Sequence, residues 1–99
     1  MTRRLRLLPR ARSDLADIWL YTARQWSMDQ ADSYIRGLND ALALLCVQPD
    51  LAPRYGKVTP PVRVHRFRSH NAIFTADDSL LEVVRVVHSR SNWQALLAD

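Results

Sequence analysis

The chain has 99 residues, of which 47% are hydrophobic and 24% are charged. This composition is that of an ordinary soluble globular protein and excludes disordered and fibrous chains, and the length predicts one domain spanning residues 1–99. The basic residues are 13 arginines and Lys57, and they give a net charge of +4. Such an excess is typical either of a solvated basic surface or of an anionic partner, because guanidinium groups bind phosphate and carboxylate through paired hydrogen bonds.

Cys46 is the single cysteine, so the chain cannot form an intramolecular disulfide. Its apolar neighbours Leu44, Leu45 and Val47 predict a small buried side chain and not a reactive thiol. The basic stretch Met1–Arg12 lacks the apolar run of a signal peptide, and no segment reaches the roughly 18 apolar residues that a membrane span needs. We therefore expect a cytoplasmic protein with no membrane partner.

The first third of the chain predicts a strand and a helix. Residues Arg3–Leu8 alternate, with Leu5 and Leu7 on one side, as in a half-buried strand. Pro9 ends this strand and lies at or near the start of an amphipathic helix that reaches Trp26. The apolar stripe of this helix comprises Ala11, Leu15, Ile18, Trp19, Thr22 and Trp26.

A second helix is predicted almost directly after the first. Ser27 and Gln30 have the spacing of a capping box, so the two helices form a hairpin in which we expect Trp19 and Trp26 to pack. Gly37 costs about 1 kcal/mol relative to alanine in an exposed helix and predicts close helix packing. The buried stripe of this helix comprises Ala31, Tyr34, Ile35, Leu38, Leu42, Leu45 and Cys46.

Several prolines and Gly56 interrupt the pattern between residues 49 and 61, which predicts one long loop. Three strand-like runs follow, Val62–Arg68, Asn71–Ala76 and Leu80–His88, and their short connections predict an antiparallel meander.

The last of these runs is mainly apolar on both sides, as expected of an interior strand that is covered on both faces. Arg85 is the exception, and it needs a partner such as Asp14 or Asp17 unless it opens onto the functional surface. Alternation predicts Leu81, Val83, Arg85 and Val87 on one face and Leu80, Val84 and Val86 on the other.

The chain closes with Trp93, Leu96 and Leu97 at helical spacing behind Asn92, a residue type that caps helices. Trp93 either docks this tail or anchors a partner. The elements together predict an α+β fold of order β-α-α-β-β-β(-α), with the helical hairpin packed on one face of the antiparallel meander. We expect the other face of the sheet to be less covered and to receive a partner or substrate.

Basic side chains gather on two of the predicted strands. They are Arg63, His65, Arg66 and Arg68, with His70 in the following turn, and Arg85, His88 and Arg90. If cross-strand pairing brings these sets together, the patch either clamps phosphates, with a histidine as proton shuttle, or is a solvated face in which arginine stems cover apolar neighbours. The histidines lack the spacing of metal ligands, so we expect neither a metal nor a cofactor.

One further set of residues covers nearly the whole chain, and its order and spacing match those of a known family. It comprises Ala11, Asp14-Leu15, Ile18, Tyr21, Tyr34 to Leu38, Pro49, Arg63, His70 to Phe74 and Glu82 to Arg90. The set resembles the ParE toxin family, within the RelE/ParE superfamily of type II toxin-antitoxin systems. The predicted helical hairpin and meander are similar to the fold of that family.

The resemblance implies a toxin that stabilises the complex of DNA gyrase with cleaved DNA, and therefore an inhibitor and not an enzyme. It also implies a ParD-like antitoxin, often in a heterotetramer, whose DNA-binding part represses the operon. The toxin would then meet DNA only through gyrase or the antitoxin. We expect the antitoxin to dock on the helical hairpin or on an open sheet edge.

We expect the target-binding surface where the last strand meets the tail, at Arg85, His88, Arg90 and Trp93. A basic patch is expected at Arg63, Arg66 and Arg68.

Two alternatives stay open. A RelE-like ribosome-dependent mRNA endonuclease would share the fold, and Arg63, His88 and Arg90 fit parts of its basic layout. The chain has no tyrosine after Tyr55 and only Lys57 as lysine, so it lacks the tail phenol and lysine cluster of those enzymes. The other alternative is a nucleic-acid-binding module that draws affinity from its net charge, although no known DNA- or RNA-binding motif accompanies the arginines.

Overall fold

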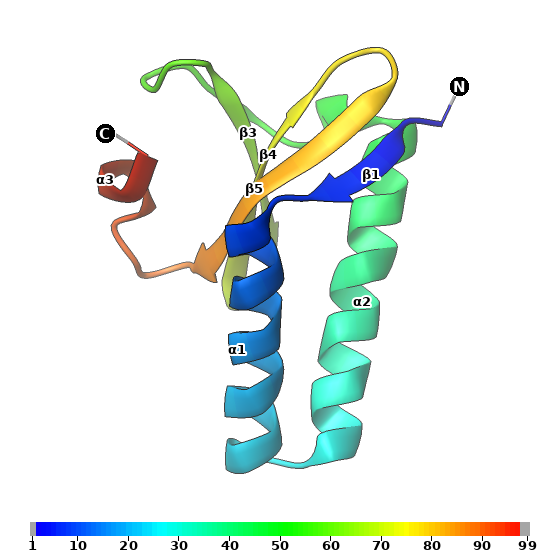
Figure 1. Cartoon of the computed structure of the whole chain (residues 1–99), viewed down its shortest axis with the longest axis vertical. Helices are drawn as coiled ribbons and strands as arrows, with labels where there is room; N and C mark the ends of the chain where they lie inside the picture. Colours follow the sequence, from blue (N-terminus) through cyan, green and yellow to red (C-terminus); the bar gives the residue numbers. More distant parts are fainter. Residues whose placement is uncertain (1, 98–99) are drawn as a thin grey trace.

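The computed structural model describes residues 2–97. Met1 and residues 98–99, the ends of the predicted domain, lie outside the described residues. Figure 1 shows the elements, which in chain order are β1 (Arg4–Leu7), α1 (Pro9–Gln25), α2 (Met28–Val47), the 3-10 helix η1 (Pro49–Leu51), β2 (Arg54–Tyr55), β3 (Val62–Phe67), β4 (His70–Ala76), β5 (Leu80–His88) and α3 (Trp93–Leu97). The predicted α+β order of a strand, two helices, three strands and a terminal helix is confirmed.

Helices α1 and α2 form the predicted hairpin (Figure 1). Pro9 is the first residue of α1, where its missing N–H costs no helical hydrogen bond. At the start of α2 the hydroxyl of Ser27 accepts a hydrogen bond from the Gln30 N–H at 3.0 Å. The indole N–H of Trp19 donates to Asp32 at 2.8 Å, so Trp19 of α1 contacts α2 across the hairpin.

Trp26 does not pack in the hairpin, and that prediction was wrong. Its side chain is 72% exposed. Helix α1 ends at Gln25, and at this end both helices extend beyond the sheet (Figure 1).

The five strands form one sheet in the order β1-β5-β4-β3-β2. Strands β3, β4 and β5 pair antiparallel through short turns, which confirms the meander. Strand β1 lies beside β5 in a parallel pair, with Leu7 opposite Val83, so the sheet is mixed and β5 is an interior strand as predicted. The helices and the meander supply the long connection that a parallel pair requires.

A bulge in β5 interrupts its alternation. Phe74 of β4 lies opposite Val83, but the preceding Ile73 lies opposite Arg85, which leaves Val84 as an extra residue on β5. Beyond this point every side chain of β5 faces the side opposite to the one that strict alternation assigns it.

The bulge corrects the two predicted faces of this strand. Val86 joins Leu81 and Val83 in the cluster under the helices, whereas Val87 belongs to the cluster on the opposite face. Arg85 pairs with a residue of that opposite cluster and so leaves the face of Leu81 and Val83. A strict period of two cannot anticipate an inserted residue, which explains the error.

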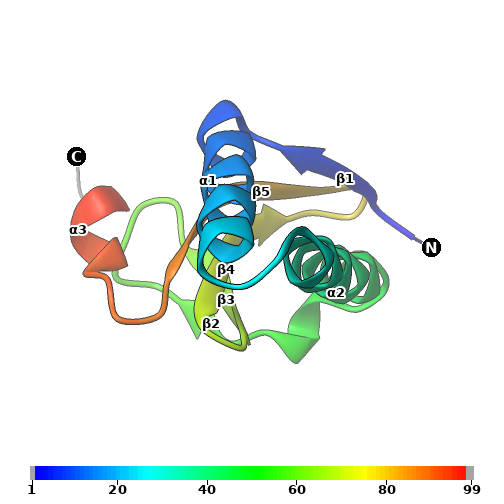
Figure 2. The same cartoon turned by 90° about the horizontal axis from the view of Figure 1, so that it is seen from below.

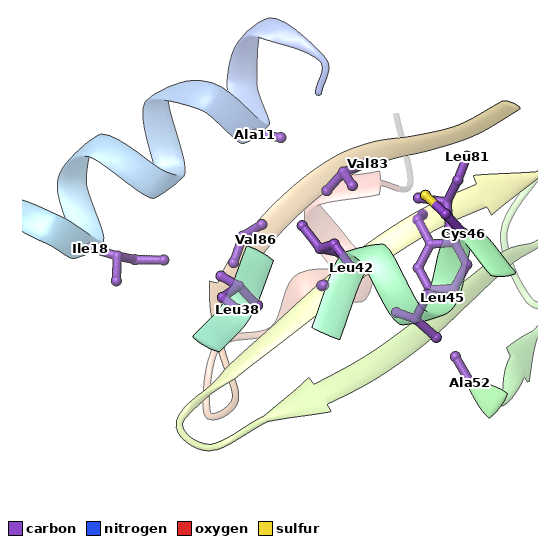
Figure 3. Close-up of a cluster of buried hydrophobic side chains, with 12 residues drawn as sticks. Ala11, Ile18, Leu38, Leu42, Leu45, Cys46, Ala52, Leu81, Val83 and Val86 are labelled. Atoms are coloured by element: carbon purple, nitrogen blue, oxygen red, sulfur yellow. The ribbon is translucent and has the colours of Figure 1, made fainter. Parts of the chain in front are cut away.

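The larger core cluster lies between the helices and the sheet (Figure 3). Its buried members are Ala11, Ile18, Leu38, Leu42, Leu45, Cys46, Ala52, Ala72, Phe74, Leu81, Val83 and Val86. Burial also raises the pKa of the Cys46 thiol, which fits the prediction of an unreactive side chain. This cluster holds α1 and α2 on one face of β4 and β5.

Gly37 marks a close approach to a strand and not to the other helix. A Cβ atom at this position would lie 2.9 Å from Cζ of Phe67 on β3. The missing side chain therefore lets α2 lie directly over the Phe67 ring, which also meets Tyr34 edge-to-face at 5.3 Å between ring centroids. The predicted contact between helices is corrected to a contact between helix and sheet.

A second cluster covers the opposite face of the sheet, where α3 lies on the side away from α2 (Figure 2). Its buried members are Val62, Ile73, Val87 and Trp93. Trp93 is 8% exposed and meets Tyr55 edge-to-face at 4.8 Å, so of the two alternatives this residue docks the tail. This face is less covered than the one under α1 and α2, as predicted, but it is not bare, because α3 and the neighbouring Val58 pack on it.

Two smaller expectations also change. The segment of residues 49–61 contains η1 and β2, and β2 pairs with β3, so it is more than a loop. In β1, Leu7 packs against the core, but Leu5 is 42% exposed because this strand lies at the sheet edge.

Candidate functional site

The candidate site lies where the helical hairpin passes the end of the sheet (Figures 1 and 2). At this end β3 and β4 are joined by Arg68 and Ser69, with Phe67 paired to His70. Arg68 has a φ of 51°, in the left-handed region that two-residue hairpin turns favour but that residues with a Cβ rarely adopt. The short turn thus holds the exposed Arg68 at the tip of the hairpin. His70 is the first residue of β4 and not a turn residue as predicted.

Tyr34 connects α2 to this turn. Its hydroxyl accepts a hydrogen bond from the Ser69 N–H at 3.3 Å and lies 2.7 Å from Nδ1 of His70. The hydroxyl also donates to the carbonyl oxygen of Phe67 at 3.4 Å, and which group donates in the pair with His70 depends on the tautomer of the His70 ring. Burial raises the pKa of Tyr34, so the phenol stays protonated and able to donate.

His70 and His88 lie opposite each other on β4 and β5, with 5.4 Å between ring centroids. Nδ1 of His88 accepts a hydrogen bond from the Arg90 N–H at 3.1 Å, so neutral His88 also carries its proton on Nε2. Burial, and then the nearby His88, lower the pKa of His70, which keeps this ring neutral near pH 7. Two imidazole rings therefore stand side by side, and His88 presents an Nε2–H donor.

An open hollow of about 610 Å³ lies beside the two histidines. Its helical side includes Asp17, Tyr21 and Trp26, and its strand side includes Arg68, His70 and His88. Tyr21 and Trp26 are 66% and 72% exposed, so much of their aromatic surface is available to a partner.

Arg85, the first residue of the predicted target-binding surface, is held by an ion pair. Its Nε and Nη2 donate to the two carboxylate oxygens of Asp14 at 2.8 and 3.0 Å, and the Val86 N–H donates to the same carboxylate at 2.9 Å. The side chains of Arg85 and Asp14 are 17% and 13% exposed, and the hydrogen bonds from Arg85 to Asp14 raise the pKa of Arg85. Asp14, one of the two candidates, is therefore the partner, and it satisfies the edge of β5 beyond the end of β1.

The other three residues of that surface separate into two places. Trp93 is buried in the second cluster, whereas His88 and Arg90 are exposed at the end of β5. His88 lines the hollow, and Arg90 is connected to it through the hydrogen bond between its N–H and the His88 ring.

The arginines of the predicted basic patch also separate. Arg63 donates to the carbonyl of Ala52 at 2.7 Å, and the Nε of Arg66 donates to the carbonyl of Arg68. Side chains alternate along β3, so Arg63 and Arg66 project from opposite faces, and β4 lies between β3 and β5. The two basic sets meet at this end of the sheet, where His70 lies opposite His88 and Arg68 lines the same hollow.

In the described part of the chain, no three histidine, cysteine or acidic side chains are grouped so as to hold a metal ion. Within residues 2–97, no helix combines the length and the apolar character that crossing a membrane requires.

Sequence reasoning missed the contact of Tyr34 with His70 and the role of Tyr21 in lining the hollow. Tyr34 and His70 are 36 residues apart, and they meet because α2 crosses the end of the β3–β4 hairpin. One signal was available in the sequence: a tyrosine within an apolar stripe carries a hydroxyl that needs a hydrogen-bond partner.

Known proteins with similar sequences and folds identify the family. The family described as the ParE toxin of type II toxin-antitoxin system, parDE, matches residues 5–93. Toxin ParE1 of Mycobacterium tuberculosis (strain ATCC 25618 / H37Rv) is 31% identical over 91 residues, which cover 91% of this chain and 93% of that protein. Toxin ParE1 of Caulobacter vibrioides is 30% identical over 92 residues, which cover 93% and 95%.

A solved structure shares the fold. The chromosomal ParDE toxin-antitoxin system from P. aeruginosa contains a chain that superimposes with a TM-score of 0.76 at 18% identity, covering 88% of this chain and 96% of that one. The family match, which spans β1 to the start of α3, decides the assignment. The chain belongs to the ParE toxin family of type II toxin-antitoxin systems.

Proposed function

We propose that this toxin inhibits DNA gyrase by stabilising its complex with cleaved DNA and that a ParD-like antitoxin neutralises it. The observation that carries the proposal is the match of the ParE toxin family to residues 5–93. The relatives named Toxin ParE1 support a toxin, and the solved ParDE system supports an antitoxin partner. The toxin acts in the cytoplasm and meets DNA through gyrase or through the antitoxin.

We further propose that the toxin acts by binding and not by catalysis. A RelE-like endonuclease would need Arg63, His88 and Arg90 around one phosphate. Arg63 lies on β3 and donates to a backbone carbonyl, whereas His88 lies at the end of β5 with β4 between the two strands. This separation supports an inhibitor over a nuclease of that layout.

Exposed apolar side chains support docking of the antitoxin on the helical hairpin. Leu44 and Val47 near the end of α2 and Leu51 in η1 are each at least half exposed. An antitoxin segment with an apolar face would cover them, and the resulting gain in burial would stabilise the toxin. The assembly expected is a hetero-oligomer, with a heterotetramer as the first candidate.

The purified toxin should be added to gyrase supercoiling and cleavage assays beside a ribosome-dependent mRNA cleavage assay. We expect supercoiling to fall, cleaved DNA to accumulate, and both effects to be reversed by the antitoxin, with the transcript left intact. Cutting of the transcript without any effect on gyrase would contradict the proposal.

A matched pair of variants tests the surface. Replacing both His88 and Arg90 by alanine should abolish most of the gyrase inhibition, because both side chains are exposed at the end of β5. Arg54→Ala removes an exposed arginine from the opposite edge of the sheet and should leave inhibition intact. Equal inhibition by both proteins would remove His88 and Arg90 from the target-binding surface.

A further inference from the structure

The strand side of the hollow holds hydrogen-bond donors. The Arg90 N–H donates to Nδ1 of His88, so the neutral His88 ring presents Nε2–H at the opposite edge of the imidazole. The His70 ring, which is hydrogen-bonded to Tyr34 through Nδ1, lies 5.4 Å from the His88 ring. Arg68 adds a guanidinium group, which lies 5.7 Å from the Phe67 ring centroid and, within residues 2–97, forms no salt bridge. Donors gathered in this way fit an oxyanion.

Aromatic faces line the other side of the same hollow. Tyr21 and Trp26 come from α1 and its C-terminal cap, and most of each side chain is exposed. The hollow of about 610 Å³ falls within the range of roughly 300–1,000 Å³ that is typical of ligand sites. Exposed aromatic rings beside basic groups are the elements with which proteins hold single-stranded nucleic acid, because every base has a face that can stack.

We propose that this hollow binds single-stranded nucleic acid directly, with a phosphate at His70, His88 and Arg68 and a base stacked on Tyr21 or Trp26. The proposal goes beyond the function given above, in which the toxin meets DNA only through gyrase or the antitoxin. A strand alternates phosphates with stacking faces, as the two sides of the hollow do, and the net charge of +4 attracts it. A duplex does not fit this arrangement, because its bases are already stacked on one another.

Asp17 tests whether removing a negative charge from the hollow tightens the binding of nucleic acid. It lies on the helical side of the hollow, four residues before Tyr21 on the same face of α1. Its carboxylate repels phosphate, which places the phosphate on the strand side. Asp17→Asn should therefore bind nucleic acid more tightly than the unmodified toxin.

Binding can be measured by fluorescence anisotropy of a labelled oligothymidine of about 12 nucleotides, a length within the usual range of such sites. We expect Trp26→Ala to weaken binding about tenfold and Trp26→Phe to retain most of it, since phenylalanine still stacks. Arg68→Ala should weaken binding more than Arg54→Ala, which removes the same charge on β2, opposite Arg63 near the other end of β3. Circular dichroism of each variant checks that the fold is intact.

Titration with inorganic phosphate tests the anion site by itself. The ring resonances of His70 and His88 should shift together in the NMR spectrum, and those shifts should be lost in Arg68→Ala.

If Trp26→Ala binds the oligonucleotide as the unmodified toxin does, or Arg54→Ala loses as much affinity as Arg68→Ala, the proposal is wrong. A glutamate-rich peptide that shifts both rings while the oligonucleotide does not would assign the hollow to a protein partner instead. The gyrase assay is independent of all these readouts.

Discussion

Trp93 and Trp26 are the same residue type in two regions of the molecule that differ in burial. Trp93 is 8% exposed and seals the second face of the sheet against Tyr55, whereas Trp26 is 72% exposed beside the hollow. A buried indole stabilises the fold through its large apolar area, while an exposed one keeps that area for a partner. The two faces of the sheet thus bury their aromatic side chains, whereas the free end of the hairpin leaves Tyr21 and Trp26 exposed.

Arg85 and Arg68 show the same contrast between a structural and an exposed side chain, here for a charged residue. Arg85 is held by two hydrogen bonds to Asp14, whose carboxylate also accepts from the Val86 N–H at the edge of β5. Arg68 stands at the tip of a two-residue turn and lines the hollow. Arginines in this molecule therefore have two roles, one in a structural ion pair and one on an exposed surface. The surroundings of each residue, and not the composition, distinguish the two roles.

The largest effect is expected for Trp93→Ala. Loss of the indole would leave a cavity over Val62, Ile73 and Val87 and detach the short α3, which is too short to be stable alone. We expect the free energy of unfolding to fall by about 3 kcal/mol in urea titrations followed by circular dichroism. A loss below about 1 kcal/mol would mean that the second face of the sheet does not depend on this residue.

Asp14→Ala should cost somewhat less. It would leave Arg85 without its partner and the Val86 N–H without an acceptor, at about 2–3 kcal/mol in the same titration. The double variant Asp14→Ala with Arg85→Met is the control, because it removes the unpaired charge and should recover part of the loss. If Asp14→Ala alone is as stable as the unmodified toxin, Arg85 is not a structural residue.

His70 should make stability depend on pH. Burial and His88 lower its pKa in the folded state, so the unfolded chain binds the proton more readily than the folded one. The stabilisation is complete above the ordinary histidine pKa of about 6.5 and is lost as the pH falls from there towards the lowered value. Urea titrations between pH 7.5 and pH 5, about the range in which histidine titrates, should show a smaller slope for His70→Gln. An identical slope in both proteins would contradict the assignment.

Trp26→Ala should have the smallest effect on stability. The side chain is largely exposed, so we expect a change of less than about 0.5 kcal/mol in the free energy of unfolding. The same substitution should weaken oligonucleotide binding, which separates a binding role from a structural one. A loss comparable to that of Trp93→Ala would show that the two regions do not differ.

Local patterns made much of the fold predictable. The capping pair Ser27 and Gln30 and the helical spacing of apolar residues marked the hairpin, and short connections marked the meander. The order and spacing of residues along the chain also led to the ParE family, which the family match confirms. In the candidate site, the basic residues Arg68, His70 and His88 were named from the sequence, and β4–β5 pairing places His70 opposite His88. The role of Tyr34 was not predicted, because it is 36 residues from His70 and meets it only where α2 crosses the sheet end.

The sequence by itself determined the elements, their order and the family, because these depend on periodicity and spacing within short segments. The tertiary structure decided the rest. It pairs β1 with β5 and makes Val84 an inserted residue. It also pairs Arg85 with Asp14 and places Gly37 over Phe67. Each of these depends on the register between distant segments. A shift of one residue moves every following side chain to the other face of a strand, and no local pattern contains that shift.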